Sequence, residues 1–388
     1  MASPAACSAA VDVAIVGAGI SGIAAASALV NARHTVAVLD ARTRVGGRLL
    51  STGLGVDLGA SWAWPAHERR AAAWARKLGV DVIPQRLDGN AFAFHQGKMQ
   101  NVGNAGPTMA PCGGDAVRMQ GGYARLAKVA SDALPPDALR LGCTVTKVEA
   151  ITNHEDGAAS LVRVTYQDGD ASSTTSELIA RRVVLAMPPG IIAKSISFSP
   201  ALPAEQRQKQ AGTLTWCGDW AKVAAHFRSP FWRSSGASGV VATPGPIQIW
   251  WEGSAGKDLG EETYSIVGLG VGEETRALQR FEATGAPEGE GNDPDALRTL
   301  VIEALTPALG DSVATELASV TAKAWIADPL TYSAGGSHRD YGHRLLSRAT
   351  PWGVHFAGTE TEAANGHVEG AILAGERAAE EVRAALAK

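Results

Sequence analysis

The sequence predicts an α/β protein with two domains: a discontinuous Rossmann-like dinucleotide-binding domain, and an α+β domain built on an antiparallel sheet. Three observations favour this fold. The pattern Gly17-x-Gly19-x-x-Gly22 follows a short apolar run, and a second glycine-rich strand-to-helix pattern occupies 354–371. Between 216 and 269, β-rich segments alternate with glycine and proline. Because both ends of the chain carry turns of the dinucleotide-binding type, we expect them to build one domain.

The N-terminal segment predicts a complete βαβ unit. Residues 11–16 form an apolar run, 20–30 have helical spacing, and a second apolar run over 35–39 ends at Asp40. Asp40 follows the glycines by about twenty residues, the spacing of the acidic residue that accepts hydrogen bonds from an adenosine ribose. The alternative is a glycine turn in a protein that binds no nucleotide.

The remaining elements are predicted from apolar periodicity and from glycine and proline breaks. We expect a helix within 67–78 that stops at Gly79, and a loop-rich connection from 91 to 122. A hairpin is expected with strands at 144–151 and 160–167 and its turn at 153–157, followed by a buried strand at 182–186 that ends at a boundary near Met187-Pro188-Pro189. Four sheet strands are expected at 220–227, 239–242, 247–251 and 264–269. A surface loop at 282–293 and a helix at 295–305 complete the predicted elements.

Composition restricts the class of protein. With 388 residues and 45% hydrophobic residues the chain can bury two cores. A net charge of −4 gives no reason to expect nucleic acid or an anionic membrane as a partner. We find no apolar run of about 20 residues, and therefore expect a soluble, cytoplasmic protein. The four cysteines (Cys7, Cys112, Cys143 and Cys217) are far apart, which favours free thiols and no metal site.

The residues after Asp40 indicate which dinucleotide binds. Arg42 and Arg44 precede Val45-Gly46-Gly47-Arg48, a run in which paired glycines allow close backbone approach and the arginines offer donors to phosphate. This run resembles the flavin-containing amine oxidase family, the monoamine and polyamine oxidases. Further blocks keep the order of that family: 57–62, 183–189, 222–232, 356–361 and 366–371.

The resemblance implies FAD as cofactor, bound by a domain made of 9–67, 119–210 and 330–388. The substrate domain would then comprise 68–118 and 211–329. The helix that starts near Val368 would direct its positive end at the flavin pyrimidine ring, where negative charge collects on reduction. Glu360 would hold the ribityl chain or a phosphate through water. The implied cofactor contacts are Gly17, Gly19, Gly22, Asp40, Arg42, Gly47, Arg48, Gly59, Ala60, Ser61, Trp62, Val148, Gly358, Glu360 and Val368.

Two residues are candidates for catalysis. Lys222 lies in the predicted strand 220–227, where alternation puts it on one face with Trp220, Ala224 and His226. From the pattern alone a solvent-exposed lysine is favoured, whereas the resemblance places a lysine here that is bonded through water to flavin N5. His367, at the start of the last helix, is a candidate to select or deprotonate the substrate, and its alternative role is simple helix capping.

The chain also departs from the family in three places. Members with covalent flavin have a cysteine shortly before the last block, and the corresponding stretch 332–335 has none, which implies non-covalent FAD. Two aromatic residues flank the flavin in monoamine oxidases, and the matching positions are Gly335 and His367. The candidate replacements are Tyr332, Trp216, Trp325 and Trp64. Finally, the segment that precedes Gly121-Gly122 is short, so the site is expected to be open or completed by a partner chain, and a homodimer is an open alternative.

The implied reaction is the oxidation of a small-molecule amine to an imine, with O2 reduced to H2O2. The first alternative is an amino-acid oxidase of the same superfamily. It would need an arginine for the substrate carboxylate, and Arg233, Arg339 and Arg344 are available. The second alternative is a regulatory protein that binds FAD without turnover.

Overall fold

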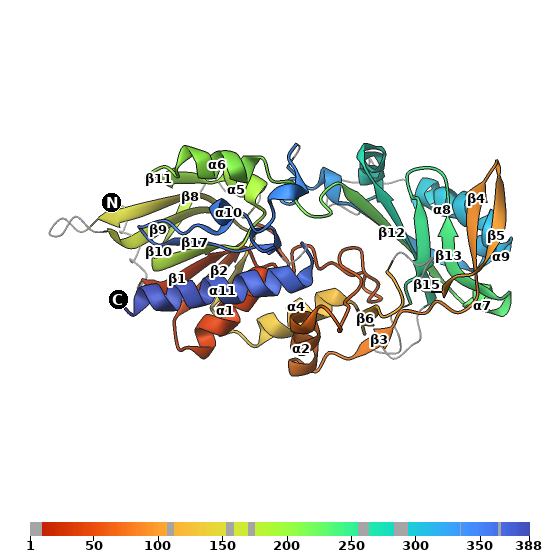
Figure 1. The fold of residues 1–388 in the computed structure, drawn as a ribbon, viewed down its shortest axis with the longest axis horizontal. Coiled ribbons are helices and arrows are strands. Elements are labelled where there is room, and N and C mark those ends of the chain that lie inside the picture. Colours follow the sequence, from red (N-terminus) through yellow and green to blue (C-terminus); the bar gives the residue numbers. More distant parts are fainter. Residues whose placement is uncertain are drawn as a thin grey trace, which may run out of the picture. The chain divides into compact units, whose positions relative to one another are not determined.

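The computed structural model describes residues 10–106, 112–152, 159–169, 175–254, 264–282, 294–333, 335–363 and 366–388. The chain folds into two compact units (Figure 1). Unit 1 comprises Met1–Gly47, Ala127–Trp216 and Ser333–Lys388, and unit 2 comprises Arg48–Leu126 and Cys217–Tyr332. These units differ from the predicted domains because 48–67 and 119–126 pack within unit 2, and unit 1 continues past residue 210, the predicted end of that segment, as far as Trp216.

Unit 1 is built on an eight-stranded mixed sheet of order β11-β8-β9-β10-β1-β2-β7, with β17 paired to β10. The strands are β1 (Val11–Val16), β2 (Val36–Asp40), β7 (Leu139–Leu141), β8 (Cys143–Thr152), β9 (Ala159–Asp168), β10 (Thr175–Leu185), β11 (Ser197–Ser199) and β17 (Val354–Phe356). The β1–β2, β1–β10 and β10–β17 pairs are parallel, and β8, β9 and β10 form an antiparallel meander. The predicted strands therefore exist, while the predicted hairpin turn at 153–157 lies outside the described residues.

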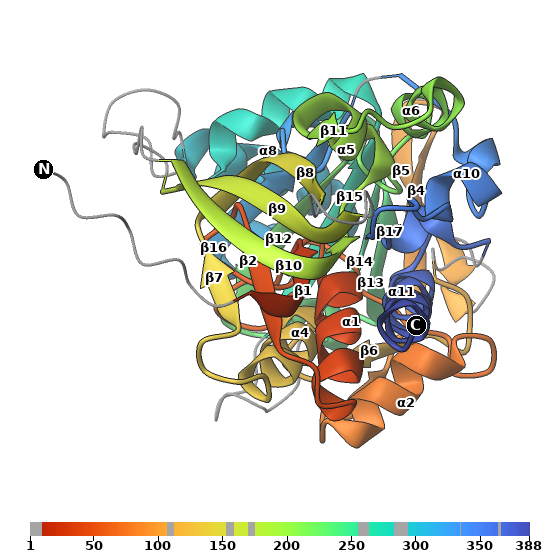
Figure 2. The same cartoon turned by 90° about the vertical axis from the view of Figure 1, so that its left-hand side faces the viewer.

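The parallel part of this sheet is covered by two helices, α1 (Ile20–Asn31) and α11 (Val368–Leu386), which lie side by side (Figure 2). Their contact depends on glycine. A Cβ at Gly375 of α11 would lie 2.2 Å from the carbonyl oxygen of Ser21 in α1. The two helices can therefore approach closely only without a side chain at this position.

Shorter helices complete unit 1. They are α5 (Pro189–Ser195), α6 (Ala204–Ala211), α10 (Arg344–Ser347) and the 3-10 turns at His338–Asp340 and Thr359–Thr361. Helix α4 (Tyr123–Asp132) contains the boundary between the units. The core of unit 1 joins the strands to these elements through buried aliphatic and aromatic side chains such as Val16, Leu39, Leu185, Ile192 and Phe356.

Unit 2 contains a seven-stranded sheet of order β16-β12-β15-β14-β13-β4-β5. The strands are β4 (Asn90–His95), β5 (Lys98–Asn104), β12 (Trp220–Phe227), β13 (Ala237–Ala242), β14 (Ile249–Glu252), β15 (Tyr264–Val271) and β16 (Leu317–Ala324). A separate ribbon pairs β3 (Val82–Pro84) with β6 (Val117–Met119). The helices are α2 (Arg69–Lys77), α7 (Phe231–Ser234), α8 (Pro294–Leu309), α9 (Ser312–Glu316) and the 3-10 segments Glu273–Phe281 and Trp325–Ala327.

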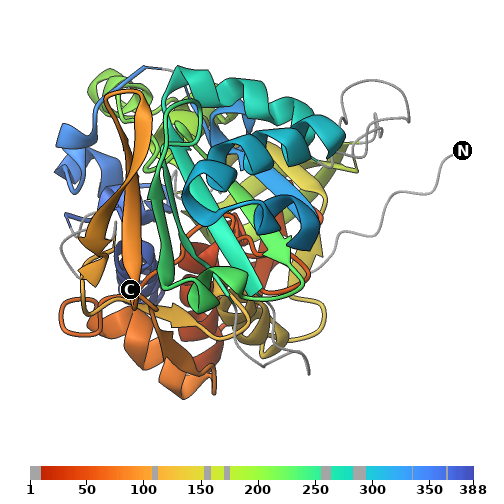
Figure 3. The ribbon, with the colours of Figure 1, turned by 90° about the vertical axis from the view of Figure 1, so that its right-hand side faces the viewer.

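Both faces of β12 are buried. Helix α8 lies against one face of the sheet (Figure 3), where Val301 and Leu305 pack with Ala221 and Val223. The opposite face packs Ala224 against a cluster that includes residues of the 56–62 segment. Lys222 points to this second face, as the alternation predicts, and it is buried there rather than solvent-exposed.

The prediction of a loop-rich connection over 91–122 is wrong. This stretch contains most of β4, all of β5 and all of β6. Strand β4 joins the sheet by parallel pairing with β13, about 150 residues away in the chain, so the large sheet is mixed rather than purely antiparallel. The whole stretch 91–122 is rich in Gly and Asn, and it shows little of the apolar alternation that predicts a strand. The predicted surface loop at 282–293 lies almost entirely outside the described residues.

The α1–α11 contact generates a stability prediction. Gly375→Ala should lower the free energy of unfolding by about 1–3 kcal/mol because its Cβ overpacks the interface. Helix propensity alone would give the opposite sign, a gain of roughly 1 kcal/mol. The same substitution at Gly53, where an added Cβ meets no atom within 4 Å, is the matched control. Equal denaturant midpoints for the two variants would contradict the packing argument.

Candidate active site

The first glycine turn joins β1 to α1 in unit 1. Gly17 has φ +105°, and a Cβ there would lie 2.5 Å from the carbonyl oxygen of Ala186. A Cβ at Gly22 would lie 1.9 Å from the carbonyl oxygen of Gly17. Since L side chains rarely adopt the conformation of Gly17 and no side chain fits at Gly22, both positions require glycine. The turn holds the start of α1 against the carboxyl edge of the sheet.

The N-terminus of α1 presents backbone N–H groups that no side chain caps. Its N-cap is Gly19, no side chain caps it, and its first turn has no acidic residue. The first N–H groups of a helix have no intrahelical acceptor, and with the helix dipole they favour an anion. These features suit a phosphate group.

Asp40 stands at the carboxyl end of β2, beside this turn, and its side chain is buried. Its Oδ2 accepts a hydrogen bond from the backbone N–H of Ala18 at 2.7 Å, and its Oδ1 accepts one from the backbone N–H of Arg42 at 2.8 Å. Each carboxylate oxygen can accept a further hydrogen bond. Asp40 thus organises the turn and keeps acceptor capacity for a ligand hydroxyl.

A second glycine loop approaches the first within unit 1. The backbone N–H of Gly46 donates to the carbonyl oxygen of Ala18 at 2.8 Å. A Cβ on Gly47 would lie 3.2 Å from the Cα of Gly19. The side chain of Arg44 donates to the carbonyl oxygens of Val45 and Gly47 and so fixes this loop. The two glycine loops predicted from the sequence are therefore neighbours.

The C-terminal block lies at the same end of the unit-1 sheet. The backbone N–H of Gly358 donates to Ser21 Oγ at 3.0 Å, which links the block to α1. Glu360 is fully buried, and its Oε1 accepts from the backbone N–H of Trp216 at 3.2 Å. Helix α11 begins at Val368, after His367 as N-cap. The structure thus brings together, at one end of the unit-1 sheet, Gly17, Gly19, Gly22, Asp40, Gly47, Gly358 and Glu360.

Arg377 of α11 holds the turn that carries Glu360, and the sequence interpretation missed it. Its guanidinium donates to the carbonyl oxygen of Phe356 at 3.0 Å and to Thr361 Oγ1 at 2.9 Å. It also pairs with Glu362 and Glu381 at 2.6 Å. Because one partly buried guanidinium binds both ends of the 356–362 turn, it fixes the position of Glu360 relative to α11. Arginine at a helical interior carries no local sequence signal for this role.

In unit 2 the buried Lys222 makes two short hydrogen bonds. Its Nζ donates to the carbonyl oxygen of Gly59 and to Ser61 Oγ, both at 2.6 Å. It also lies 5.9 Å and 5.3 Å from the ring centroids of Trp62 and Trp251, within cation–π range. Burial lowers the pKa of Lys222 to about 8, and the nearby charge of Asp57 opposes this shift.

The segment 57–62, which binds Lys222, is fixed by close contacts and hydrogen bonds with its neighbours in unit 2. A Cβ at Gly59 would lie 1.8 Å from the carbonyl oxygen of Arg48, and Ala60 donates its N–H to the same oxygen. Asp57 accepts from Ser51 Oγ at 2.7 Å and from the backbone N–H of Tyr123 at 2.8 Å. Burial raises the pKa of Asp57 to about 6. Arg48, Gly59, Ala60, Ser61 and Trp62 therefore form one structural group in unit 2.

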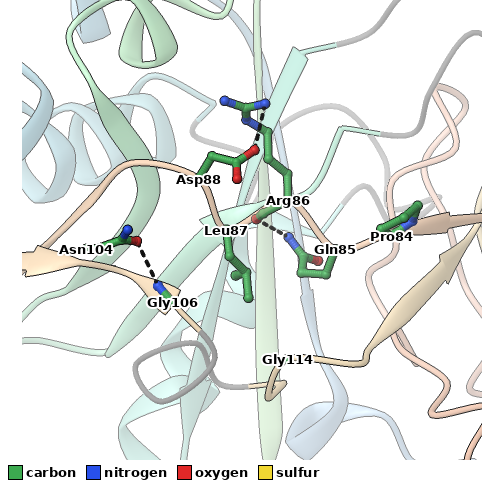
Figure 4. Close-up of a pocket in the computed structure, with 8 residues that line it drawn as sticks. All are labelled: Pro84, Gln85, Arg86, Leu87, Asp88, Asn104, Gly106 and Gly114. Atoms are coloured by element: carbon green, nitrogen blue, oxygen red, sulfur yellow. Dashed lines mark hydrogen bonds and ion pairs between the residues drawn. The ribbon is translucent and has the colours of Figure 1, made fainter.

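A cavity of about 580 Å³ in unit 2 is lined by 84–88, Asn104, Gly106 and Gly114 (Figure 4). Arg86 pairs with Asp88 at 3.3 Å, and Gln85 Nε2 donates to the carbonyl oxygen of Arg86 at 3.1 Å. Asn104 Oδ1 accepts from the backbone N–H of Gly106 at 3.2 Å. These polar groups bind one another, so the cavity by itself does not indicate a ligand.

Comparison with protein families decides the identity. The family model for flavin containing amine oxidoreductases matches residues 103–383, and the model for an NAD(P)-binding Rossmann-like domain matches 15–78. The chain belongs to the flavin-containing amine oxidoreductase family. It is accordingly a FAD-dependent oxidoreductase of the amine oxidase class, which acts on CH–NH bonds.

Individual relatives agree with the family. The chain is 26% identical to AofH of Mycobacterium tuberculosis strain H37Rv, assigned by its name to the flavin-containing monoamine oxidases, over 97% of each chain. It is 25% identical to putrescine oxidase of Kocuria rosea over 96% of this chain and 95% of the relative. Cyclohexylamine oxidase from Brevibacterium oxydans IH-35A has a similar structure, with a TM-score of 0.74, 22% identity, and coverage of 98% of this chain and 100% of that one. This last likeness shows the shared fold.

The residues of unit 1 fit the FAD of this family. The uncapped N-terminus of α1 and the glycine turns leave backbone groups accessible to a phosphate. In addition, the buried hydroxyls of Thr215 and Ser333 have no hydrogen-bond partner among the described residues. A buried polar atom without a partner indicates a missing water or ligand. Ser333 Oγ lies only 2.1 Å from where a Cβ at Gly190 would stand, so glycine is required there. Val148, another predicted contact, is fully buried in the unit-1 core.

The amine oxidase structure revises the expected aromatic positions. In unit 1 the ring centroid of Trp216 lies 5.3 Å from that of His367 and 5.6 Å from that of His338. Tyr341 joins this cluster at 6.2 Å from Trp216. Gly335, predicted to match one of the two aromatic positions, has no ring. His338, three residues later, belongs to the cluster and was not among the predicted residues. Of the predicted replacements Trp216 lies in the cluster, whereas Tyr332, Trp325 and Trp64 belong to unit 2.

The described residues contain neither a membrane-spanning helix nor a cluster of potential metal ligands. No helix among the described residues of this amine oxidase combines the length and hydrophobicity needed to cross a bilayer. Within the same residues, no group of three or more His, Cys, Asp or Glu side chains could hold a metal ion. Cys112, Cys143 and Cys217 form no disulfide among the described residues, and Cys7 lies outside them.

Proposed function

We propose that the protein oxidises a primary or secondary amine to an imine and passes the electrons to O2, giving H2O2. Water then hydrolyses the imine to an aldehyde or ketone and ammonia or an amine. The observation that carries this proposal is the buried Lys222, held by Gly59 and Ser61 within the segment predicted to contact the flavin. A buried lysine is costly, and a sheet position does not require one.

FAD supplies the redox chemistry, and the protein supplies binding, orientation and electrostatics. An ammonium group has three N–H donors. Two of those on Lys222 are bound by Gly59 and Ser61, and the third has no acceptor among the described residues. We propose that this third donor holds a water molecule and assists the reaction with oxygen. We further propose that FAD is bound without a covalent link, so that acid precipitation of the protein leaves the flavin in the supernatant.

The substrate is proposed to react as a neutral amine. A weakly polar site favours that form because burial disfavours the ammonium cation. The cluster of Trp216, His338, Tyr341 and His367 provides aromatic surfaces for such a group in unit 1. His367 is proposed to select or deprotonate the amine, and its ring does not cap α11 through a side-chain hydrogen bond.

The structure weakens the three arginines considered for an amino-acid oxidase. Arg233 is paired with the buried Glu252, and Arg339 and Arg344 are exposed. None of the three is therefore a buried cation available to a carboxylate. The non-catalytic alternative predicts that no amine is consumed. Measuring H2O2 and a carbonyl product with a panel of amines tests it directly.

Lys222→Met should slow reoxidation of the flavin by O2 by about 100-fold, the lower range for a positioned proton-transfer group. Reduction by the amine should change much less, since the lysine is assigned to the oxygen step. Stopped-flow measurement of the two half-reactions separates these effects. The matched control is Lys98→Met, on the exposed strand β5. Reoxidation at the wild-type rate would remove Lys222 from the oxygen step.

The same lysine predicts a pH dependence. Its pKa of about 8 means that the cation is lost as pH rises through this value. Because the charged form is assigned to assist the oxygen reaction, reoxidation should fall above pH 8 in the wild type. The charged groups that influence Lys222 are Asp57, with its pKa raised to about 6, and Cys217. The descending limb should be absent in Lys222→Met, and its persistence there would contradict the assignment.

His367→Phe should alter the pH profile of flavin reduction by the amine, because the ring that selects or deprotonates the amine is replaced by one that does not titrate. The aromatic contact with Trp216 is retained in this variant. His95→Phe, at an exposed site on β4, is the control. Superimposable profiles for wild type and His367→Phe would limit His367 to a structural role at the start of α11.

A further inference from the structure

Lys222 is a buried ammonium group whose hydrogen bonds go to neutral atoms. Its acceptors are the carbonyl oxygen of Gly59 and Ser61 Oγ, and no carboxylate of the described residues forms an ion pair with it. The residue is 5% exposed. Burial favours the neutral amine, because a charge in an apolar site loses its hydration. The charged form that the oxygen reaction is proposed to need therefore requires negative charge nearby.

Asp57 is the carboxylate placed to supply that charge within unit 2. It begins the segment 57–61, which provides both acceptors of Lys222 Nζ, so one short piece of backbone carries the carboxylate and the two acceptors. Asp57 is 6% exposed. The residues on either side of it pack in an apolar cluster with Trp251, whose ring lies 5.3 Å from Lys222 Nζ. The two charges therefore interact across apolar surroundings, which weaken an attraction less than water does.

Hydrogen bonds and a second cation keep Asp57 ionised at neutral pH. Its Oδ1 accepts from Ser51 Oγ at 2.7 Å and from the backbone N–H of Tyr123 at 2.8 Å. The buried guanidinium of Arg118 in β6 also acts on it electrostatically. Burial raises the pKa of Asp57 to about 6, while these hydrogen bonds, Lys222 and Arg118 oppose the rise. The carboxylate is therefore mostly charged above about pH 6.

The other titratable groups near Lys222 do not provide its main negative charge. Lys323 stands opposite Lys222 in β16, and it is paired with Glu282 at 2.7 Å and with Asp328 at 3.2 Å. Its charge is thus balanced within its own group. Cys217 acts on Lys222 electrostatically, and its influence is the smaller of the two that raise the pKa of the lysine. A thiol also supplies negative charge only once it is ionised.

We propose that Asp57 is a positioning residue for the oxygen reaction, which holds Lys222 in its charged form. This inference rests on the proposed role of Lys222 in that reaction. The carboxylate acts through Lys222 rather than on the flavin or on oxygen. Its attraction reduces the cost of burying the ammonium group, so the lysine keeps its proton at a pH where burial alone would favour the neutral amine.

The first experiment measures reoxidation of the flavin in Asp57→Asn as a function of pH. The holoenzyme is reduced photochemically and mixed with O2, so no amine substrate is needed. Lys222 holds its proton below its pKa of about 8, and loss of the Asp57 charge removes an interaction that raises this pKa. The descending limb of the profile should therefore move to lower pH by about one unit, the low end of the shift that a nearby opposite charge produces.

Three matched variants separate charge from structure. Ser51→Ala removes a hydrogen bond of Asp57 and keeps its carboxylate, so the limb should stay at the wild-type pH. Asp88→Asn removes an exposed carboxylate of the same unit and should also leave the limb in place. Cys217→Ser should move the limb less than Asp57→Asn does, because its influence on Lys222 is smaller. An unmoved limb in Asp57→Asn, or an equal shift in Ser51→Ala, would overturn the proposal.

The second experiment detects the interaction without catalysis. Unfolding by denaturant is measured for the wild type and Lys222→Met over a range of pH. Because burial raises the folded pKa of Asp57 above its unfolded value, ionisation above about pH 6 lowers the stability of both proteins. It does so less in the wild type, where Lys222 attracts the new charge. The free energy of unfolding of the wild type minus that of Lys222→Met should therefore rise as pH increases through about 6.

A difference that stays flat through this window would contradict the interaction, whether or not Asp57→Asn folds. The reoxidation profiles also separate this inference from the proposed function. If the wild type has a descending limb that Lys222→Met lacks, and Asp57→Asn keeps it at the wild-type pH, Asp57 is not the positioning residue and the role of Lys222 stands. If the wild-type profile has no limb that depends on Lys222, the proposed role of the lysine fails, and this inference fails with it.

Discussion

The close approach of backbones that lack a Cβ is the constraint on which unit 1 depends. Gly17 and Gly22 let α1 start directly above the edge of β1, and Gly375 lets α11 pack on α1. Each added Cβ would lie within 2.5 Å of a carbonyl oxygen. Because both helices begin at the same edge of the sheet, the donor ends of two helices gather there, with Gly47 and Glu360 beside them. A site for a dinucleotide is thus a consequence of packing that only glycine permits.

Unit 2 depends on a different constraint, the burial of charge. Lys222 and Arg118 are both buried, and the carboxylate of Asp57 acts electrostatically on both of them, while that of Glu252 acts on Arg118. Such an arrangement costs folding free energy, and hydrophobic replacements would often be more stable. Perturbed groups of this kind concentrate at functional sites. The cost is therefore consistent with groups that act on ligands rather than on the stability of the sheet.

Sequence patterns within short segments predicted those elements whose structure depends on neighbouring residues in the chain. The β1–α1–β2 unit and the closing β17–α11 segment follow from apolar periodicity and required glycines, and both stand where expected. The alternation along β12 correctly put Lys222 with Ala224 on one face, yet it could not show that this face is buried by the 56–62 segment. The strands β4 and β5 were missed because they lie in a stretch rich in Gly and Asn that was interpreted as a loop, and because the pairing of β4 with β13 is long-range.

In the candidate site, too, features set within single loops were predicted and features set by long-range contacts were missed. The family motifs predicted the residues that line the glycine turns, since their spacing is fixed within single loops. Arg118, Arg377 and His338 were missed because their roles arise from contacts between distant segments. That no described residue accepts a hydrogen bond from Arg118 Nε is visible only when the neighbours of its guanidinium are placed in space. The compact units also divide the chain differently from the predicted domains, because 48–67 continues a cofactor motif in sequence while it packs in unit 2.

We propose that this chain oxidises an amine with bound FAD. The most direct test is the visible spectrum of the purified holoenzyme under anaerobic conditions, before and after addition of amines and amino acids. The flavin band should be bleached by at least one class of these compounds and restored by oxygen. A fully loaded flavin whose spectrum no amine or amino acid changes would contradict it.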